Sequence, residues 1–289
     1  MVLTADGYRK VTLFAAVSLA VIVVTGATVR LTGSGLGCTN WPECTRGHLA
    51  PAQISNSPAM IEFLNRVVTG IVSVAAIVAV LGSMVRRPRR RDLTSLSWGL
   101  VAGVLAQIVL GGLVVVFDLS PRLVMGHFVL SMLIVWNAVV LHHRASRADG
   151  PVRAIVSERV RAVSRLVFAA AALVVLTGTV VTAAGPHAGD DQAQRLDVVV
   201  RDVARIHSVA VWLLLGVTLV AARWIWSDRS APVVRTAIEA LLVAIVAQGA
   251  IGYTQYFTGV PALLVGIHIV GALAVWICAT RLTLVVAAP

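Results

Sequence analysis

The chain has 289 residues, of which 58% are hydrophobic and 13% are charged, and its formal net charge is +11. Its mean hydropathy of +0.89 exceeds what a soluble domain of this length can hide from water in one core. The composition therefore excludes a soluble enzyme and indicates a membrane protein. The positive charge does not indicate a nucleic-acid partner, because Lys and Arg gather in the short segments between apolar runs.

Eight apolar runs are almost free of charge, and each is long enough to cross a hydrocarbon core of roughly 30 Å as a helix. They lie at about residues 11–29, 61–85, 94–117, 123–143, 161–184, 203–226, 233–257 and 261–284. The first run lacks a small-residue cleavage site at its end, so we expect a retained helix and not a cleaved signal peptide.

The basic residues lie in alternate connecting segments. They form four clusters, at Arg9 and Lys10, at 86–91, between 144 and 165, and at Arg223, Arg229 and Arg235. The positive-inside rule places these clusters in the cytoplasm. We therefore predict a multi-pass protein of the bacterial inner (cell) membrane, surrounded by lipid, with both termini cytoplasmic. The loops predicted to face outward are 30–60, 118–122, 185–202 and 258–260.

An internal repeat divides the chain into two halves. A shift of 141 residues aligns Ala106-Gln107 with Ala247-Gln248 and His127 with His268. Slightly different shifts align Thr25-Gly26 with Thr177-Gly178 and Asn65 with His207. Each half has four helices, and an even number of crossings gives both halves the same orientation in the membrane. The predicted fold is an all-α membrane protein of two parallel, pseudo-symmetric four-helix bundles, residues 1–145 and 146–289.

Polar residues inside predicted spans are candidates for function, because they are costly in a bilayer. The even-numbered helices carry one each, near the outer end and at similar depth: Asn65, His127, His207 and His268. They form two facing pairs, and two imidazoles from facing helices can give the six-coordinate haem iron of a b-type cytochrome. A single histidine near a helix end is more often structural; the repeat is what favours haem.

Glu62 lies on the same helical face as Asn65, one turn nearer the outside. Its counterpart in the second half is Ala204, so the two halves differ in function. A carboxylate beside a bound haem can accept a proton or stabilise a developing cation, and a salt bridge to Arg66 is the alternative role. Arginines at the outer helix ends are candidates for haem propionates, although snorkelling explains them equally well. They are Arg30, Arg66, Arg122 and Arg205.

Cys38 and Cys44 bracket a short segment of the first outer loop, where the environment permits disulfides. We expect a bridge that closes this loop. A metal site would need more ligands than two thiols, and a dithiol that shuttles electrons is the other option. Cys278, deep in the last span, is interpreted as a packing residue.

The chain resembles the haem A synthase family in three runs, Thr25-Gly-Ala-Thr-Val-Arg-Leu-Thr-Gly-Ser-Gly-Leu-Gly-Cys38, Asn40-Trp-Pro-Glu-Cys44 and Glu62-Phe-Leu-Asn-Arg66. The helix number, the repeat and the histidine positions extend the resemblance over the whole chain. The resemblance implies a cofactor, haem b, on His207 and His268, and a substrate, haem O, in the N-terminal half. There the C8 methyl group would be oxidised to the formyl group of haem A by successive hydroxylations, with water as the oxygen source and Glu62 as a catalytic residue.

Many members of that family carry His where this chain has Asn65. Asn is a poor iron ligand, so the expected metal ligands are His127, His207 and His268, and Asn65 would orient a water or a propionate. The resemblance also implies a haem O synthase, a terminal oxidase and an electron acceptor as partners, and the oligomeric state stays open, a homo-oligomer included.

The alternative function is a membrane b-type cytochrome that transfers electrons or carries haem without altering it. Such a protein has little need of a carboxylate and a cysteine loop in one half only. A transporter with a midplane site is disfavoured, because the polar residues gather near the outer leaflet.

Overall fold

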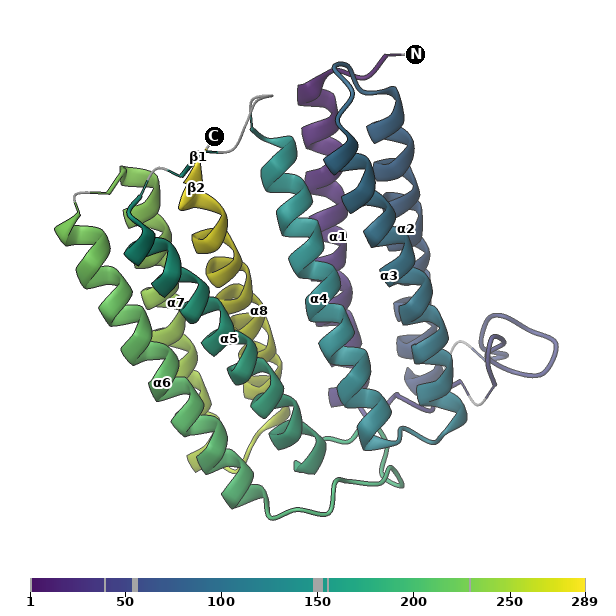
Figure 1. Cartoon of the computed structure of the whole chain (residues 1–289). Coiled ribbons are helices and arrows are strands. Elements are labelled where there is room, and N and C mark those ends of the chain that lie inside the picture. The colour runs from purple at the N-terminus through teal and green to yellow at the C-terminus, as the bar shows by residue number, and fades with distance from the viewer. Residues whose placement is uncertain are drawn as a thin grey trace. The chain divides into compact units, whose positions relative to one another are not determined.

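The computed structural model describes residues 2–38, 40–53, 57–147, 153–154, 156–228 and 230–288. Within those residues eight helices are long and apolar enough to cross a membrane, which confirms the predicted all-α membrane fold (Figure 1). They are α1 (Ala5–Leu31), α2 (Ser57–Val85), α3 (Arg91–Val116), α4 (Pro121–Ala145), α5 (Glu158–Ala184), α6 (Val200–Ser227), α7 (Pro232–Phe257) and α8 (Ala262–Val285). Arg229 and residues 148–152, which belong to predicted basic clusters, lie outside the described residues.

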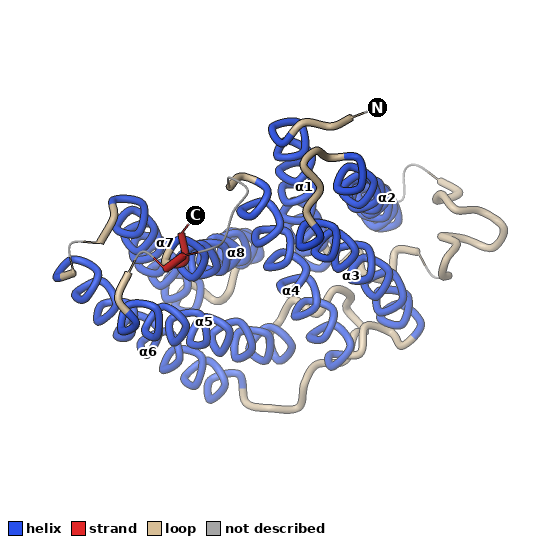
Figure 2. The backbone as a smooth tube through the Cα atoms, turned by 45° about the horizontal axis from the view of Figure 1, so that its top comes forward, coloured by secondary structure: helices blue, strands red, loops and turns tan. Residues whose placement is uncertain are grey.

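Two very short strands accompany the helices. β1 (Arg153–Ala154) pairs antiparallel with β2 (Ala287–Ala288), and the pair is drawn in red in Figure 2. It joins the segment before α5 to the end of α8 and leaves the helical architecture unchanged.

The helix boundaries lie close to the predicted ones except at the start of α1. The sequence predicted a start near residue 11, but α1 begins at Ala5. The Thr4 side chain accepts a hydrogen bond from the Gly7 N–H (3.1 Å), and Asp6 pairs with Arg9 and Lys10 one turn on. Capping and ion pairing therefore extend the helix through a polar turn that apolar periodicity does not mark.

Contacts among the described residues divide the chain into two units. The first comprises Met1–Ala145 with Thr182–Val198, and the second comprises Ser146–Val181 and Val199–Pro289. The segment between α5 and α6 therefore belongs to the first unit by its contacts. This grouping differs from a simple cut after residue 145, because tertiary contacts hold Thr182–Val198 against residues of the first bundle.

Each unit contains a four-helix bundle. In the first, α1 and α3 each contact both α2 and α4, so α2 and α4 lie at opposite corners. In the second, α7 contacts α6 and α8. Helix α5 reaches the same two helices, α6 through Thr177 and His207 and α8 through the rings of Phe168 and Trp276, whose centroids are 4.9 Å apart. Helices α6 and α8 therefore also lie at opposite corners.

The close-packed core of each bundle lies toward the end that is predicted to be cytoplasmic. Leu93, Leu100 and Leu141 are fully buried there in the first bundle, and Ile238, Leu241 and Leu282 in the second. We call the opposite end the outer end, after the predicted topology.

The turns before α4 and α8 have the same backbone geometry. Leu119 and Val260 both have φ of 58°, and their N–H groups donate to equivalent carbonyls, Val114 (2.8 Å) and Gln255 (2.7 Å). Positive φ is uncommon for residues other than glycine, and most of all for a β-branched one such as Val260. The tight turn sets His127 and His268 at the same position, in the second turn of the following helix.

Candidate functional site

The polar residues lie in a layer of each bundle that side chains leave partly open. No residue is buried in this layer of the first bundle, at 24–28, 63–71, 105–111 and 121–131. The same is true of α6, α7 and α8 in the second bundle, at 200–209, 246–257 and 262–272, whereas Thr179 of α5 is buried. Close packing is the normal state of a protein interior, so these layers differ from the cores beneath them. Asn65, His127, His207 and His268 all lie in the layers and are half-buried.

His207 of α6 is held by two residues of α5. Its Nδ1 lies 3.0 Å from the hydroxyl of Thr177, and that hydroxyl also lies 2.9 Å from the carbonyl of Leu173. The carbonyl of Val174 lies 3.1 Å from the same hydroxyl. When the hydroxyl proton goes to either carbonyl, the Thr177 oxygen can accept from Nδ1–H. This tautomer leaves the lone pair on Nε2, which is the nitrogen that can bind a metal.

Gly178 gives the His207 ring its space. A Cβ atom on Gly178 would lie 3.1 Å from Cε1 of His207, which is tighter than ordinary van der Waals contact. The ring therefore packs directly on the backbone of α5, and the glycine fixes how far it can turn.

His268 of α8 has the same environment on α7. A Cβ on Gly252 would lie 3.0 Å from Cε1 of His268, and the Gln248 side chain donates to the His268 carbonyl (2.6 Å). His268 is close enough to His207 to interact with it electrostatically. The two imidazoles come from helices at opposite corners of the bundle, and their facing arrangement as a ligand pair stays a prediction.

His127 of α4 repeats this arrangement in the first bundle. Gly111 of α3 would place a Cβ 3.2 Å from Cε1 of His127, and Gln107 donates to the His127 carbonyl (3.1 Å). Among the described residues, Nδ1 of His127 and Nδ1 of His268 are buried and have no hydrogen-bond partner. The two histidines therefore have equivalent surroundings: a glutamine that donates to the backbone carbonyl, a glycine against the ring, and an Nδ1 atom without a partner.

Asn65 of α2 takes the place that His207 has in the second bundle. Thr25 of α1, the counterpart of Thr177, donates to Oδ1 of Asn65 (2.8 Å). A Cβ atom added to Gly26, the counterpart of Gly178, would meet no other atom within 4 Å. The shorter amide side chain therefore leaves space where an imidazole packs in the other three cases.

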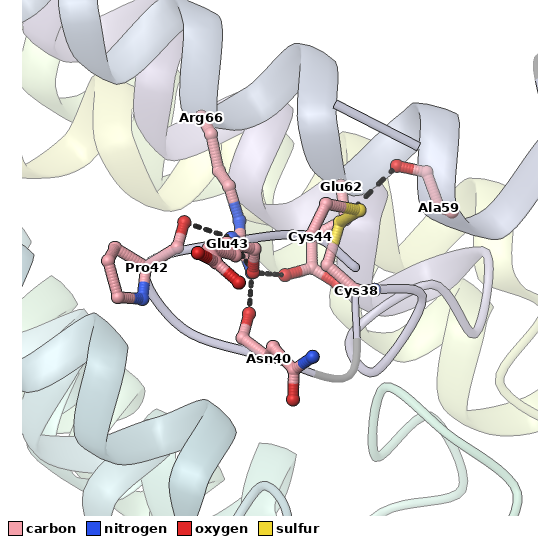
Figure 3. Close-up of a disulfide and its surroundings, with 8 residues drawn as sticks. All are labelled: Cys38, Asn40, Pro42, Glu43, Cys44, Ala59, Glu62 and Arg66. Carbon is pink, nitrogen blue, oxygen red and sulfur yellow. Dashed lines mark hydrogen bonds and ion pairs between the residues drawn. A yellow bond between two sulfur atoms is a disulfide. The ribbon is translucent and has the colours of Figure 1, made fainter. Parts of the chain in front are cut away.

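Glu62 is buried at the outer end of α2, beneath the disulfide loop. One carboxylate oxygen accepts from the Cys38 N–H (2.7 Å), and the other pairs with Arg66 (2.5 Å). Arg66 also donates to the carbonyls of Pro42 and Glu43, each at 3.1 Å (Figure 3). The salt bridge considered as the alternative role of Glu62 is thus present, and it connects the carboxylate to the loop.

The loop is anchored to α2 and α3 at further points. Cys38 and Cys44 form the predicted disulfide. A Cβ on Gly37 would lie 2.5 Å from the backbone of Pro58, and a Cβ on Gly112 would lie 2.6 Å from the Trp41 ring. Only glycine permits these two close approaches. They seat the loop on the start of α2 and on the end of α3.

Arg30 holds the segment Thr182–Val198 against the first bundle. Its guanidinium donates to the carbonyls of His187 (2.5 Å) and Thr182 (2.6 Å), and the Gly35 N–H donates to the carbonyl of Gly189 (2.8 Å). Together with the disulfide loop, this segment forms what we call the cap. Its buried residues and those beneath it include Val29, Ser34, Cys38, Cys44, Ala59, Glu62, Leu119 and Ala188.

The structure brings the predicted site residues into two groups. His207 and His268 form one group; His127, Asn65, Glu62 and Arg66 belong to the first bundle. Arg205 is exposed and lies 3.7 Å from Asp202, so its role as a propionate contact stays a prediction, as does that of Arg66. Cys278 is a half-buried free cysteine. Within the described residues, no three His, Cys, Asp or Glu side chains are grouped to hold a bare metal ion.

Sequence reasoning missed the residues that position the site. The repeat aligned Thr25-Gly26 with Thr177-Gly178, and that alignment was the available signal for their roles. Nothing in the sequence pattern indicated that Arg30 would bind carbonyls of a segment more than a hundred residues away.

Comparison with known proteins gives a family and several relatives. The COX15-CtaA family, described as cytochrome oxidase assembly protein, matches residues 9–280. A heme A synthase of Lysinibacillus sphaericus is 34% identical over 128 residues, 44% of this chain and 41% of that protein. One of Listeria welshimeri is 32% identical over 126 residues (43% and 41%), and one of Exiguobacterium sibiricum is 31% identical over 137 residues (46% and 46%). The chain thus aligns with less than half the length of these curated relatives.

Proposed function

The chain belongs to the COX15-CtaA family of cytochrome oxidase assembly proteins, and from this premise we propose that it is a haem A synthase, which converts haem O to haem A by oxidising the C8 methyl group. Curated relatives that carry the name heme A synthase support the proposal. The observation that carries it is the asymmetry between the bundles: both present imidazoles to an open layer, but only the first adds a buried carboxylate and a cap.

The second bundle fits a permanent haem b. His207 and His268 come from opposite corners, and Thr177 lies within hydrogen-bond distance of Nδ1 of His207, which keeps Nε2 available to iron. No residue of α6, α7 or α8 at 200–209, 246–257 and 262–272 is buried. Bis-imidazole ligation between bundle helices is a known haem geometry. When bound there, haem b would supply one-electron transfer between the substrate site and an electron acceptor of the membrane.

The first bundle fits the substrate. His127 is the imidazole available to the iron of haem O, and the layer around it is covered by the cap, whereas the second bundle has no such cover among its own described residues. A capped site limits the access of solvent to reactive intermediates. It also lets one porphyrin edge be recognised by residues that the other bundle lacks.

The proposed reaction needs water and an electron sink. Conversion of the methyl group to the formyl group consumes one water and releases four electrons and four protons, in two successive two-electron oxidations. The new oxygen comes from water. The four electrons pass to an acceptor of the membrane, and the four protons pass to water at the outer end.

We assign Glu62 to the methyl carbon of the substrate, where its charge would assist the oxidation. Its two oxygens are engaged by the Cys38 N–H and by Arg66, so the carboxylate offers a fixed negative charge. A fixed charge that is already oriented stabilises a positive centre without reorganisation in the transition state. We assign Glu62 this electrostatic role in preference to proton uptake.

The test is to express the protein in a membrane host that supplies haem O and to identify the extracted haems by chromatography and mass. Haem A should appear with the native protein and fall sharply with Glu62→Gln, which removes the charge but keeps an acceptor for the Cys38 N–H. Recovery of haem A at the native level from Glu62→Gln would contradict the role of the charge.

Glu239→Ala is the matched control, because Glu239 is an exposed carboxylate on a helix of the other bundle. It should leave the yield of haem A unchanged. If the native protein returns only unmodified haem while haem O is demonstrably supplied, the chain carries haem or electrons and the synthase proposal fails.

A further inference from the structure

The side-chain amide of Asn65 is held in one orientation, and its Nδ2 donor makes no hydrogen bond among the described residues. Thr25 donates to its Oδ1, which directs the Nδ2 hydrogens away from Thr25. A donor of this kind inside a membrane-spanning bundle gains from an acceptor close by.

The surroundings of Asn65 offer room for such an acceptor. Asn65 lies on the inward face of α2, in the series of positions that includes Glu62, Val72 and Ala76, all of which are buried. It stands at the corner opposite His127. The space next to Gly26, which extends at least 4 Å from the expected Cβ position, is the space that the His207 ring takes up beside Gly178.

From these observations we infer that the first bundle contains a binding site for a small, water-sized ligand that accepts a hydrogen bond from Asn65. The site lies between Asn65 and the sixth coordination position of an iron held by His127. The chemical class of the ligand is water, hydroxide or a diatomic molecule such as carbon monoxide or cyanide. This inference rests on the proposed function, because the iron is that of the substrate.

The two bundles would then differ in coordination. In the second bundle His207 and His268 would both hold the iron of haem b, which would supply electron transfer. The first bundle closes one axial position and leaves the other to an exchangeable ligand, which is compatible with a substrate that enters and leaves. Asn65 selects the ligand through a hydrogen bond. Thr25 is a positioning residue, because it orients the amide of Asn65.

The experiment uses the full-length protein purified from a host that supplies haem O. Carbon monoxide is added to the reduced protein and cyanide to the oxidised protein, and binding is followed by optical spectra. We expect one fraction of the haem to bind both probes, and the haem of the second bundle to bind neither. Asn65→His should abolish probe binding and add a low-spin signal, since it restores an imidazole beside Gly26.

Asn65→Leu tests the hydrogen bond and does not depend on how a new histidine packs. It should still bind both probes, release cyanide about two- to tenfold faster, the effect of losing one hydrogen bond, and raise the carbon–oxygen stretching frequency of bound carbon monoxide. His127→Ala should lose this haem altogether, which identifies the reactive fraction.

The outcomes separate this inference from the proposed function. If the native protein yields haem A but none of its haem binds the probes, the ligand site is wrong and the synthase proposal stands. Probe binding that persists unchanged in Asn65→His also contradicts the site. If haem O is supplied but neither retained nor converted, the proposed function fails, and this inference fails with it.

Discussion

The junction of α1 with α2 and the junction of α5 with α6 differ by one functional side chain. Both place a threonine and a glycine, Thr25-Gly26 or Thr177-Gly178, against one polar residue of the next helix. In the second bundle that residue is His207, whose ring fills the space beside the glycine. In the first it is Asn65, and the space stays open. The comparison teaches that one residue of the next helix decides whether the space beside the glycine is filled or open.

The outer ends extend this difference. The first bundle is covered by the cap, in which Glu62, Arg66 and the Cys38–Cys44 disulfide are joined by hydrogen bonds. The second bundle carries Ala204 where the first carries Glu62. The first bundle thus has a buried carboxylate and a cover at its outer end, and the second bundle has two imidazoles and an alanine at the position that matches Glu62.

The largest expected effect is the loss of either histidine of the second bundle. His207→Ala or His268→Ala should lower the affinity for haem b by more than about 100-fold, because even residues that only orient a ligand contribute roughly 10–100-fold. The measurement is haem b content per chain after purification. His48→Ala, in the exposed outer loop, is the control, and retention of haem b by both variants would refute the bis-imidazole site.

Thr177→Val should come next, with about a 10–100-fold loss of haem b affinity. The variant removes the oxygen that accepts from Nδ1–H of His207, so the ring loses both its orientation and its preferred tautomer. Thr177→Ser keeps the hydroxyl and should retain most of the affinity. Equal haem b titrations of the two variants would show that the hydroxyl has no part in positioning the ring.

Gly178→Ala and Gly26→Ala form a matched pair that sharpens the comparison directly. The added methyl group at 178 meets the His207 ring at 3.1 Å, and such overpacking costs about 1–3 kcal/mol. We expect faster haem b loss and an altered low-spin spectrum. At 26 the methyl group meets nothing within 4 Å, so the spectrum and release rate of the haem held by the first bundle should stay unchanged. Equal responses of the two variants would contradict the difference in packing.

The smallest effect is expected at Arg205. Its ion pair with Asp202 is exposed and long (3.7 Å), and exposed pairs of this kind contribute little to stability. Arg205→Ala should leave the thermal stability of the haem-free protein unchanged. If the arginine binds a propionate as predicted, the variant should release haem b a few times faster, and an unchanged release rate would remove Arg205 from the site.

Much of the architecture could be predicted because it depends on local composition. The length and apolar character of the runs predicted all eight helices, and the repeat matched His127 with His268 and Asn65 with His207. The Cys38–Cys44 bridge was also predictable, since the two cysteines lie six positions apart in a loop expected to face an oxidising side. The start of α1 was predicted wrongly, because a hydrogen-bonded cap at Thr4 extends the helix beyond its apolar run.

Only the tertiary structure shows which side chains and backbone groups form hydrogen bonds with each other. The sequence by itself determined that Glu62 lies one turn from Asn65, but only the folded loop gave its carboxylate the Cys38 N–H and fixed Arg66 on the loop carbonyls. Likewise, Arg30 reaches the segment Thr182–Val198 through folding, since no periodicity links residues so distant in the chain. The local sequence pattern predicts where a helix forms and which face is apolar. Hydrogen bonds between distant segments depend on how the helices and loops pack.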